Sequence, residues 1–194
     1  PAQSAAPAPR SLSEVETASL VQGAACAYIC LAEAAALAAG QKLLVHAAAG
    51  SVGSACVELA HDLGAVVTAS CREVDRDYVR SLGATPVLYG HGLEARVREL
   101  APNGVDAAFD TAGTDEAVDA SLALVTDKRR IVTIVAIGRA QTDGLASAGG
   151  KTRRVVNFAG PGFNGMVTLE TRDSSWAHGV TLYAPGSPNA ERWT

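Results

Sequence analysis

Residues 43–65 decide the fold, and they read LLVHAAAGSVGSACVELAHDLGA. An apolar run opens this stretch, small residues follow it, and an amphipathic run continues to Gly64. This order predicts a buried strand, a tight loop and a helix. The loop carries the spacing Ala47-x-x-Gly50-x-x-Gly53, a variant of the dinucleotide-binding pattern with alanine at its first glycine position.

The two glycines of this loop have separate physical roles. Gly50 lets the backbone approach a pyrophosphate, and Gly53 lets the helix pack closely on the strand. The N–H groups at the helix start and the positive end of the helix dipole then hold the phosphate charge. The expected cofactor loop comprises Ala49, Gly50, Ser51, Val52 and Gly53. A turn without any ligand is the alternative, and a Walker-type phosphate loop fits less well because no Gly-Lys-Ser/Thr follows.

Strand and helix patterns alternate along the chain as far as residue 137. Strands are expected at about 43–48, 66–70, 86–89, 105–109 and 130–137. Helices are expected at about 51–63, 74–82, 93–100 and 115–125. The alternation predicts an α/β fold with a Rossmann-type, doubly wound parallel sheet covered on both faces. Right-handed crossovers favour the strand order 3-2-1-4-5.

The regions on either side of this core have a different character. Residues 1–11 are rich in proline and alanine and are predicted to be a linker or a disordered lead. Ser13-x-x-Glu16 is a capping box that starts a helical lead-in, which we expect to run to about Ala39. The dinucleotide-binding domain is assigned to residues 12–150. Residues 151–194 form an irregular or β-like tail, with short β-like runs at 155–158, 166–171 and 180–183.

Composition excludes several classes of partner. Apolar residues make up 48% of the 194 residues and aromatic residues only 5%, which suits alanine-rich helices on an aliphatic sheet. The net charge of −4 offers no basic surface for nucleic acid. No apolar stretch is expected to span a membrane. The four cysteines contain no Cys-x-x-Cys pair, so we expect no metal site and a reducing, cytoplasmic setting.

The segment VHAAAGSVG at residues 45–53 resembles the cofactor loop of the medium-chain dehydrogenase/reductase superfamily. Its zinc-free quinone oxidoreductase branch and the related enoyl reductases are the most similar. The resemblance covers about residues 12–150 and is specific as a set, although each motif alone is weak. Further matching segments, in the family's order, are Leu12–Ala18, Cys26–Tyr28, Arg80–Ala84, Gly104–Gly113 and Arg130–Ile134.

The end of the second strand indicates which nicotinamide cofactor is bound. NAD-binding proteins place a carboxylate there, which accepts from the ribose 2′-hydroxyl. This chain has Ser70 and then Arg72, and we expect both to donate to the 2′-phosphate of NADPH. For Arg72, a solvated surface arginine is the alternative, and the nearby Glu73 would restore an acidic contact. The resemblance adds Tyr89 beside the adenosine phosphate, where an ordinary strand-end tyrosine is the alternative.

The ends of the fourth and fifth strands complete the expected site. Ligands of open α/β sheets lie beyond the carboxyl ends of the strands. Three residues after the fourth strand should therefore edge the ribose, namely Thr111, Ala112 and Gly113. Asp110 is interpreted as a buried turn residue. After the fifth strand, the resemblance implies that Ile137 packs near the nicotinamide and that Gly138 leaves room for it, although a core strand and a turn explain these residues almost as well.

Other polar positions are interpreted as structural. His46 lies inside the first strand, where we expect a core histidine with one hydrogen bond. The basic turn Lys128–Arg130 is interpreted as solvated, in preference to phosphate binding. Cys26 and Cys30 are expected to be small buried side chains on a helix.

The resemblance implies hydride transfer from NADPH to a small α,β-unsaturated carbonyl or a quinone. In that family the substrate lies between this domain and a barrel-like catalytic domain outside these 194 residues, so the catalytic residues stay unknown. A non-catalytic dinucleotide-binding fragment, or a module of a larger multidomain synthase, is the alternative. A short-chain dehydrogenase is excluded because no tyrosine has a lysine four residues later, and Ser70 argues against a methyltransferase. A homodimer stays open.

Overall fold

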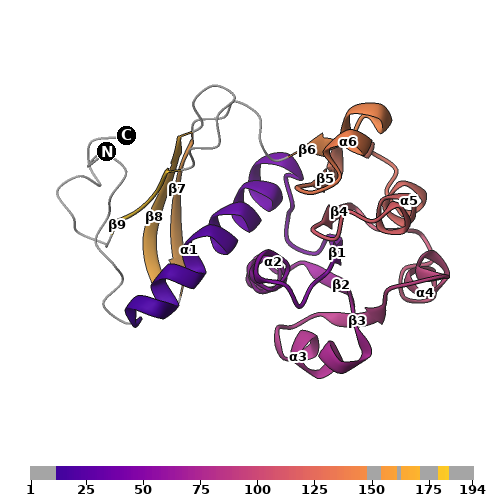
Figure 1. Ribbon diagram of the computed structural model, residues 1–194, viewed down its shortest axis with the longest axis horizontal. Helices are drawn as coiled ribbons and strands as arrows, with labels where there is room; N and C mark the ends of the chain where they lie inside the picture. Colours follow the sequence, from indigo (N-terminus) through magenta and orange to yellow (C-terminus); the bar gives the residue numbers. More distant parts are fainter. Residues whose placement is uncertain (1–11, 148–153, 161–162, 171–178, 184–194) are drawn as a thin grey trace. The chain divides into compact units, whose positions relative to one another are not determined.

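The computed structural model describes residues 12–147, 154–160, 163–170 and 179–183 (Figure 1). The chain divides into two compact units, of which the larger is Cys26–Ala148. Because the larger unit contains the whole predicted cofactor loop, the site can be described from this unit alone.

A parallel sheet forms the centre of the larger unit. Its described strands are β1 (Lys42–His46), β2 (Val66–Cys71), β3 (Thr85–Leu88), β4 (Ala107–Asp110), β5 (Ile131–Thr133) and β6 (Ala146–Ser147). They follow the order β3-β2-β1-β4-β5-β6, and every neighbouring pair is parallel. The order confirms the predicted 3-2-1-4-5 arrangement. The edge strand β6 was not predicted, because a strand of this length leaves no periodic pattern in the sequence.

Helices follow the strands in alternation and lie on both faces of the sheet (Figure 1). They are α2 (Ser51–Asp62), α3 (Arg76–Ser81), α4 (Leu93–Leu100), α5 (Asp115–Leu124) and α6 (Ile137–Asp143). Short 3₁₀ turns, η3 (Glu73–Asp75) and η4 (Lys128–Arg130), precede α3 and β5. The helices expected at 93–100, 51–63 and 115–125 are therefore confirmed to within a residue.

The side chains of β1 show why helices must pack on both faces of the sheet. Leu43 and Val45 lie in one buried cluster with residues of α2 and α3, whereas Leu44 lies in a second cluster with residues of α4 and α5. All three leucine and valine side chains are fully buried. Successive side chains of a strand point to opposite faces. The apolar run at the start of residues 43–65 is therefore the signature of a strand buried on both sides.

The predicted capping box is confirmed at the start of α1 (Glu14–Tyr28). The Glu16 carboxylate accepts hydrogen bonds from Ser13 N at 2.8 Å and from Ser13 Oγ at 2.7 Å, and Glu16 N donates to Ser13 Oγ at 3.3 Å. The helix continues as a π-helical segment, η2 (Ile29–Ala34). It ends there and not near Ala39, because Ala36 adopts a left-handed backbone with φ of 46°. A run of alanines contains no signal for such an end.

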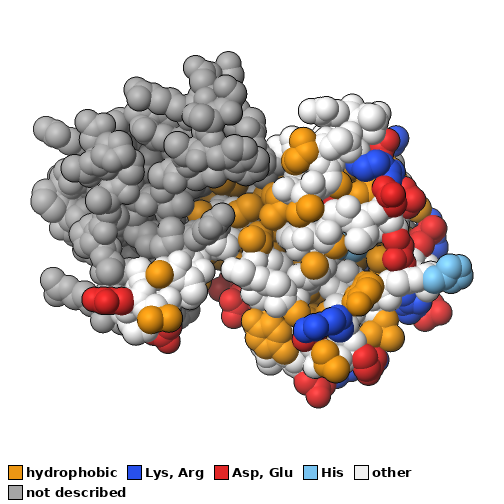
Figure 2. Space-filling model, viewed as in Figure 1, with side chains coloured by type: hydrophobic (Ala, Val, Ile, Leu, Met, Phe, Trp, Pro, Cys, Tyr) orange, Lys and Arg blue, Asp and Glu red, His pale blue; other side chains and the backbone are white. Residues whose placement is uncertain are grey.

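The expectation that no apolar stretch has the length of a membrane span was wrong. The helical stretch Glu14–Ala32 is long and apolar enough to cross one, and 31% of its most apolar window is buried. The core helix of a soluble protein passes the same test of length and composition. On the face of the larger unit drawn in Figure 2, acidic and basic side chains are interspersed along the outer rim.

The β-like runs predicted after residue 151 fall within strands, except for residue 171, which lies outside the described residues. The strands are β7 (Arg154–Gly160), β8 (Phe163–Glu170) and β9 (Gly179–Tyr183). They pair antiparallel in the order β7-β8-β9. The predicted linker at residues 1–11 lies outside the described residues.

The end of β5 differs from the prediction. The strand was expected to continue to residue 137, but it ends at Thr133 and α6 begins at Ile137. The Thr133 hydroxyl accepts from Val135 N at 3.2 Å and from Ala136 N at 2.9 Å, which turns the backbone out of the sheet. Ile137 and Gly138 therefore open a helix and do not end a strand.

Arg130 corrects the interpretation of the basic turn as solvated. Its guanidinium donates to the carbonyls of Ala35 at 2.9 Å and Ala36 at 3.3 Å, and to Gln41 Oε1 at 2.7 Å. These bonds satisfy carbonyls just after the end of the lead-in helix. Arg130 thus fastens the lead-in to the start of β5.

Replacing Arg130 by alanine is expected to lower the free energy of unfolding by about 1–3 kcal/mol, because its bonds to Ala35 and Gln41 are lost. Arg129→Ala is the matched control, since Arg129 is exposed and pairs with its neighbour Asp127. Urea denaturation of both variants measures the difference. A loss of equal size in the control would contradict the anchoring role of Arg130.

Candidate functional site

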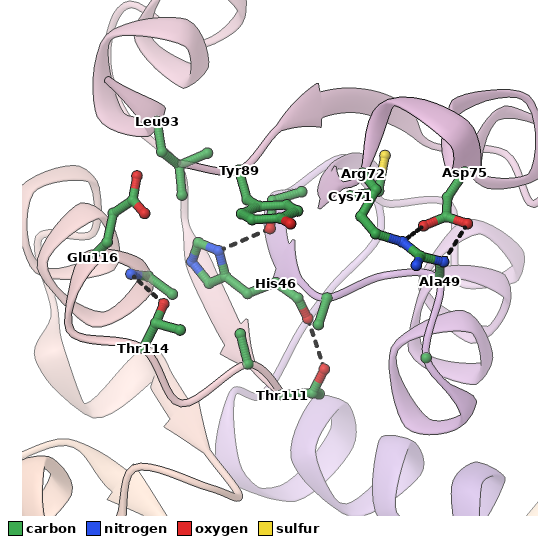
Figure 3. Close-up of a pocket in the computed structure, with 15 residues that line it drawn as sticks. His46, Ala49, Cys71, Arg72, Asp75, Tyr89, Leu93, Thr111, Thr114 and Glu116 are labelled. Atoms are coloured by element: carbon green, nitrogen blue, oxygen red, sulfur yellow. Dashed lines mark hydrogen bonds and ion pairs between the residues drawn. The ribbon is translucent and has the colours of Figure 1, made fainter. Parts of the chain in front are cut away.

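A cavity of about 500 Å³ opens at the carboxyl ends of β1, β2 and β4 (Figure 3). Such a position is the usual ligand site of an open α/β sheet. The predicted site residues that line it are Ala49, Gly50, Ser70, Arg72, Tyr89, Thr111 and Ala112. Predicted residues that are not part of its lining are Ser51, Val52, Gly53, Gly113, Ile137 and Gly138.

The loop between β1 and α2 forms one wall of this cavity. Gly50 N donates to the Ala47 carbonyl at 3.0 Å, and Gly50 is the N-cap of α2. No side chain of the described residues caps this helix start. The first N–H groups of α2 are thus left for a ligand, as a phosphate site requires.

Close packing explains the second glycine of the loop. A Cβ atom at Gly53 would collide with the carbonyl oxygen of Ala47 and would lie 2.9 Å from Ala48 Cα. At Gly50 a Cβ atom would meet Ala47 O at 3.3 Å, which is tight but less severe. Gly53 therefore allows α2 to approach the turn, in agreement with the role expected from the sequence.

Ala47 occupies the first position of the glycine pattern with an unusual backbone. Its φ is 54°, in the left-handed region that costs a residue with a Cβ about 1–2 kcal/mol. Strain of this kind clusters at binding sites, where the surrounding structure holds it in place. The substitution of alanine for the expected glycine therefore keeps the loop geometry at a cost in stability.

A buried polar chain passes behind the cavity. His46 Nε2 lies 2.9 Å from Ser121 Oγ, and Nδ1 lies 3.2 Å from Ser70 Oγ. The Ser121 hydroxyl donates its proton to the Ala117 carbonyl at 2.9 Å, so it accepts from Nε2. In the neutral ring Nδ1 then accepts from Ser70. The described residues thus give His46 two hydrogen bonds, one more than expected, and it lines the cavity.

This assignment changes the role of Ser70. Its hydroxyl proton is directed at His46, and its remaining lone pair is available on the cavity side. The residue is 3% exposed. Ser70 therefore presents an acceptor to a ligand, which corrects the donor role expected from the sequence.

Asp110 is a buried turn residue, as predicted. Its carboxylate accepts from Ala112 N at 3.0 Å, from Gly113 N at 2.9 Å and from Thr133 Oγ1 at 2.8 Å. Thr111 Oγ1 donates to the carbonyl of His46 at 2.7 Å. These bonds hold the turn after β4 against β1 and β5. Gly113 thus supports the cavity wall from behind and does not line it.

Arg72 lines the cavity together with an acidic partner. Its Nε and Nη2 donate to the two carboxylate oxygens of Asp75, at 2.6 and 3.1 Å. This hydrogen-bonded pairing lowers the pKa of Asp75. The Arg72 side chain is 65% exposed, and one guanidinium nitrogen, Nη1, makes no hydrogen bond with the described residues. The spacing of three residues between the partners is the signal that could have identified Asp75.

The far wall of the cavity was missed by sequence reasoning. It comes from the first turns of α4 and α5, whose residues here are Leu93, Thr114, Glu116 and Ala117. Buried within it, Glu116 Oε1 has no hydrogen-bond partner among the described residues. No sequence motif marks this wall, because it forms where two helix starts meet in space.

One of the four cysteines, Cys71, lies in the lining of the cavity. Cys30, Cys56 and Cys71 are buried, Cys26 is half-buried, and all four thiols are free. Within the described ranges, no three His, Cys, Asp or Glu side chains come together in a way that could hold a metal ion.

Gly53→Ala is expected to lower the free energy of unfolding by about 1–3 kcal/mol, because the new methyl group overlaps the Ala47 carbonyl. Gly138→Ala is the control, since a Cβ atom there meets no described atom within 4 Å. It should leave stability unchanged or raise it by up to about 1 kcal/mol. Thermal unfolding compares the two, and equal stabilities would refute the packing role of Gly53.

Burial lowers the pKa of His46 to about 4, although the nearby Asp110 acts in the opposite direction. The unfolded chain takes up this proton near pH 6.5, before the folded chain does. The stability that His46 contributes is therefore complete above pH 6.5 and falls as the pH decreases towards 4. We expect a loss of about 2 kcal/mol between pH 7 and pH 5.

Urea denaturation at pH 7 and pH 5 measures this loss. His46→Gln should reduce it, whereas the control His61→Gln, on the exposed side of α2, should keep it. If His46→Gln keeps the same pH dependence, the buried neutral histidine is not its cause.

Comparison with known proteins agrees with this geometry. The family described as zinc-binding dehydrogenase matches residues 51–169. Polyketide synthase GfsB of Streptomyces halstedii is 36% identical over 139 residues, which are 72% of this chain and 2% of that protein. The CurK enoyl reductase structure has a TM-score of 0.62 and 26% identity, over 72% of this chain and 45% of that one.

A quinone oxidoreductase of Pseudomonas syringae pv. Tomato DC3000 gives a TM-score of 0.60 and 26% identity, over 72% of this chain and 47% of that one. The chain thus spans less than half the length of each of these relatives. The family match itself covers more than half of the chain and includes the start of α2. The chain therefore belongs to the zinc-binding dehydrogenase family, within the medium-chain dehydrogenase/reductase superfamily that contains the quinone and enoyl reductases.

Proposed function

We propose that this chain is the cofactor-binding domain of an NADPH-dependent oxidoreductase that reduces a small α,β-unsaturated carbonyl or a quinone. The observation that carries the proposal is the cavity at the carboxyl ends of β1, β2 and β4, beside an α2 start that no described side chain caps. Bound NADPH supplies the hydride, and the protein supplies its position. In this proposal the dinucleotide-binding domain is residues 12–150.

The proposed contacts follow the shape of the cofactor. The N–H groups of Ser51, Val52 and Gly53 hold the pyrophosphate, because they open α2 and the helix dipole is positive there. Small residues Ala49 and Gly50 give the backbone access to it. The chemistry of the α2 start, with donors and no capping acceptor, fits an anion.

The adenosine ribose is assigned to the end of β2. Ser70 accepts from a ribose hydroxyl, since its own proton is held by His46. Arg72 donates to the 2′-phosphate with the guanidinium hydrogens that Asp75 does not take. Tyr89, which is 59% exposed at the cavity, lies beside this phosphate.

The ribose side of the cofactor is assigned to the end of β4, and the nicotinamide to the residues after β5. Thr111 and Ala112 line the cavity and edge the ribose, and Gly113 holds their turn. Ile137 is 38% exposed at the start of α6, and the space around Gly138 is open among the described atoms. Both properties suit the nicotinamide position that the resemblance implies for Ile137 and Gly138.

The catalytic residues stay unassigned. The family name implies zinc, but the described residues include no set of ligands that fits it, so no step is derived through a metal. A module of a larger multidomain synthase, or a fragment that binds without catalysis, is the alternative. The identity to polyketide synthase GfsB supports the module. A cytoplasmic location and a homodimer remain predictions that belong to the same proposal.

The fluorescence of NADPH on addition of the chain tests the cofactor part of this proposal, with NADH as the control. We expect saturable binding of NADPH. Addition of a quinone or an enone then separates an active domain, which consumes the NADPH signal, from a binding module, which keeps it. If neither nucleotide binds, the proposal is wrong.

Arg72→Ala is expected to weaken NADPH binding about tenfold and to affect NADH binding little, because only NADPH carries the 2′-phosphate. Asp75→Asn should act in the opposite direction, since it removes the carboxylate that competes for the same guanidinium. Titration of both variants with both nucleotides measures the effects. Equal losses for NADPH and NADH in Arg72→Ala would rule out the assigned role.

A further inference from the structure

The far wall of the cavity combines an apolar surface with one unsatisfied acceptor. Leu93 and Ala117 line it and are 2% and 3% exposed. Glu116 also lines this wall, and its buried Oε1 atom has no hydrogen-bond partner among the described residues. A buried acceptor without a partner is costly, so a ligand that donates a hydrogen bond there gains more than an ordinary contact.

The position of this wall matches one end of the proposed cofactor. In Figure 3, Glu116 and Thr114 lie on the side of the cavity opposite Arg72 and Asp75, with His46 and Tyr89 drawn between them. If Arg72 holds the 2′-phosphate, the group that extends from the ribose towards α5 is the purine base. A flat base needs apolar walls, which Leu93 and Ala117 supply.

We propose that Glu116 recognises adenine by accepting a hydrogen bond from its 6-amino group. This inference rests on the proposed function, because it requires the dinucleotide in the cavity. A purine with a 6-oxo group would place an oxygen against the carboxylate oxygen, and two acceptors cannot share a hydrogen bond. The cavity therefore selects adenine over hypoxanthine.

Thr114 offers a hydrogen-bond donor to the same edge of the purine base. Its Oγ1 accepts from Ala117 N at 3.3 Å, and its hydroxyl proton has no acceptor among the described residues. That proton can be donated to N1 of adenine, which is an acceptor. Hypoxanthine carries a hydrogen on N1 and an oxygen at C6, so it presents the reverse pattern to both side chains.

Binding of two nucleotides tests the proposal directly. The chain is titrated with NADPH and with reduced nicotinamide hypoxanthine dinucleotide phosphate, and nicotinamide fluorescence reports both. We expect the chain to bind NADPH at least about tenfold more tightly, the effect of one hydrogen bond to a charged group. In Glu116→Gln the preference should fall below about threefold, because an amide offers both a donor and an acceptor.

Glu99→Gln is the control, since Glu99 is an exposed acid on α4 outside the cavity lining, and it should keep the full preference. Equal binding of the two nucleotides by the unmodified chain would overturn the inference and leave the proposed function standing. An unchanged preference in Glu116→Gln would also overturn it. If neither nucleotide binds, the proposed function fails and this inference fails with it.

Discussion

The close approach of α2 to the turn after β1 is the constraint on which the rest of the site depends. Gly53 has no Cβ atom, and only for that reason does the first turn of α2 rest against Ala47 and Ala48. The same contact directs the first N–H groups of the helix toward the sheet's carboxyl edge. Ala47 holds a left-handed backbone there, so the loop geometry is kept even at a local cost.

Buried polar bonds turn this contact into a defined cavity. His46 links β1 to β2 through Ser70 and to α5 through Ser121, while Asp110 links β4 to β5. Because these groups are buried and partnered, their orientations are fixed. The walls of the cavity consequently differ in character: one side offers the cation of Arg72, and the other offers the carboxylate of Glu116.

Much of the fold could be predicted from the sequence, because parallel strands joined by right-handed crossovers admit few orders. The loop at Gly50 and Gly53 was predictable for the same kind of reason, since few residues satisfy its sterics. The end of β5 was not, because the Thr133 side chain turns the backbone through bonds that no periodicity reveals. Glu116 was missed because its wall joins helix starts that lie far apart in the chain.

Backbone amide chemical shifts of the ¹⁵N-labelled chain, recorded during a titration with NADPH, test the central claim most directly. We expect the amide signals of Ser51, Val52 and Gly53 to move most, because these amides donate to the pyrophosphate at the start of α2. Amide signals that stay in place at these three positions while the cofactor saturates the chain would contradict this claim.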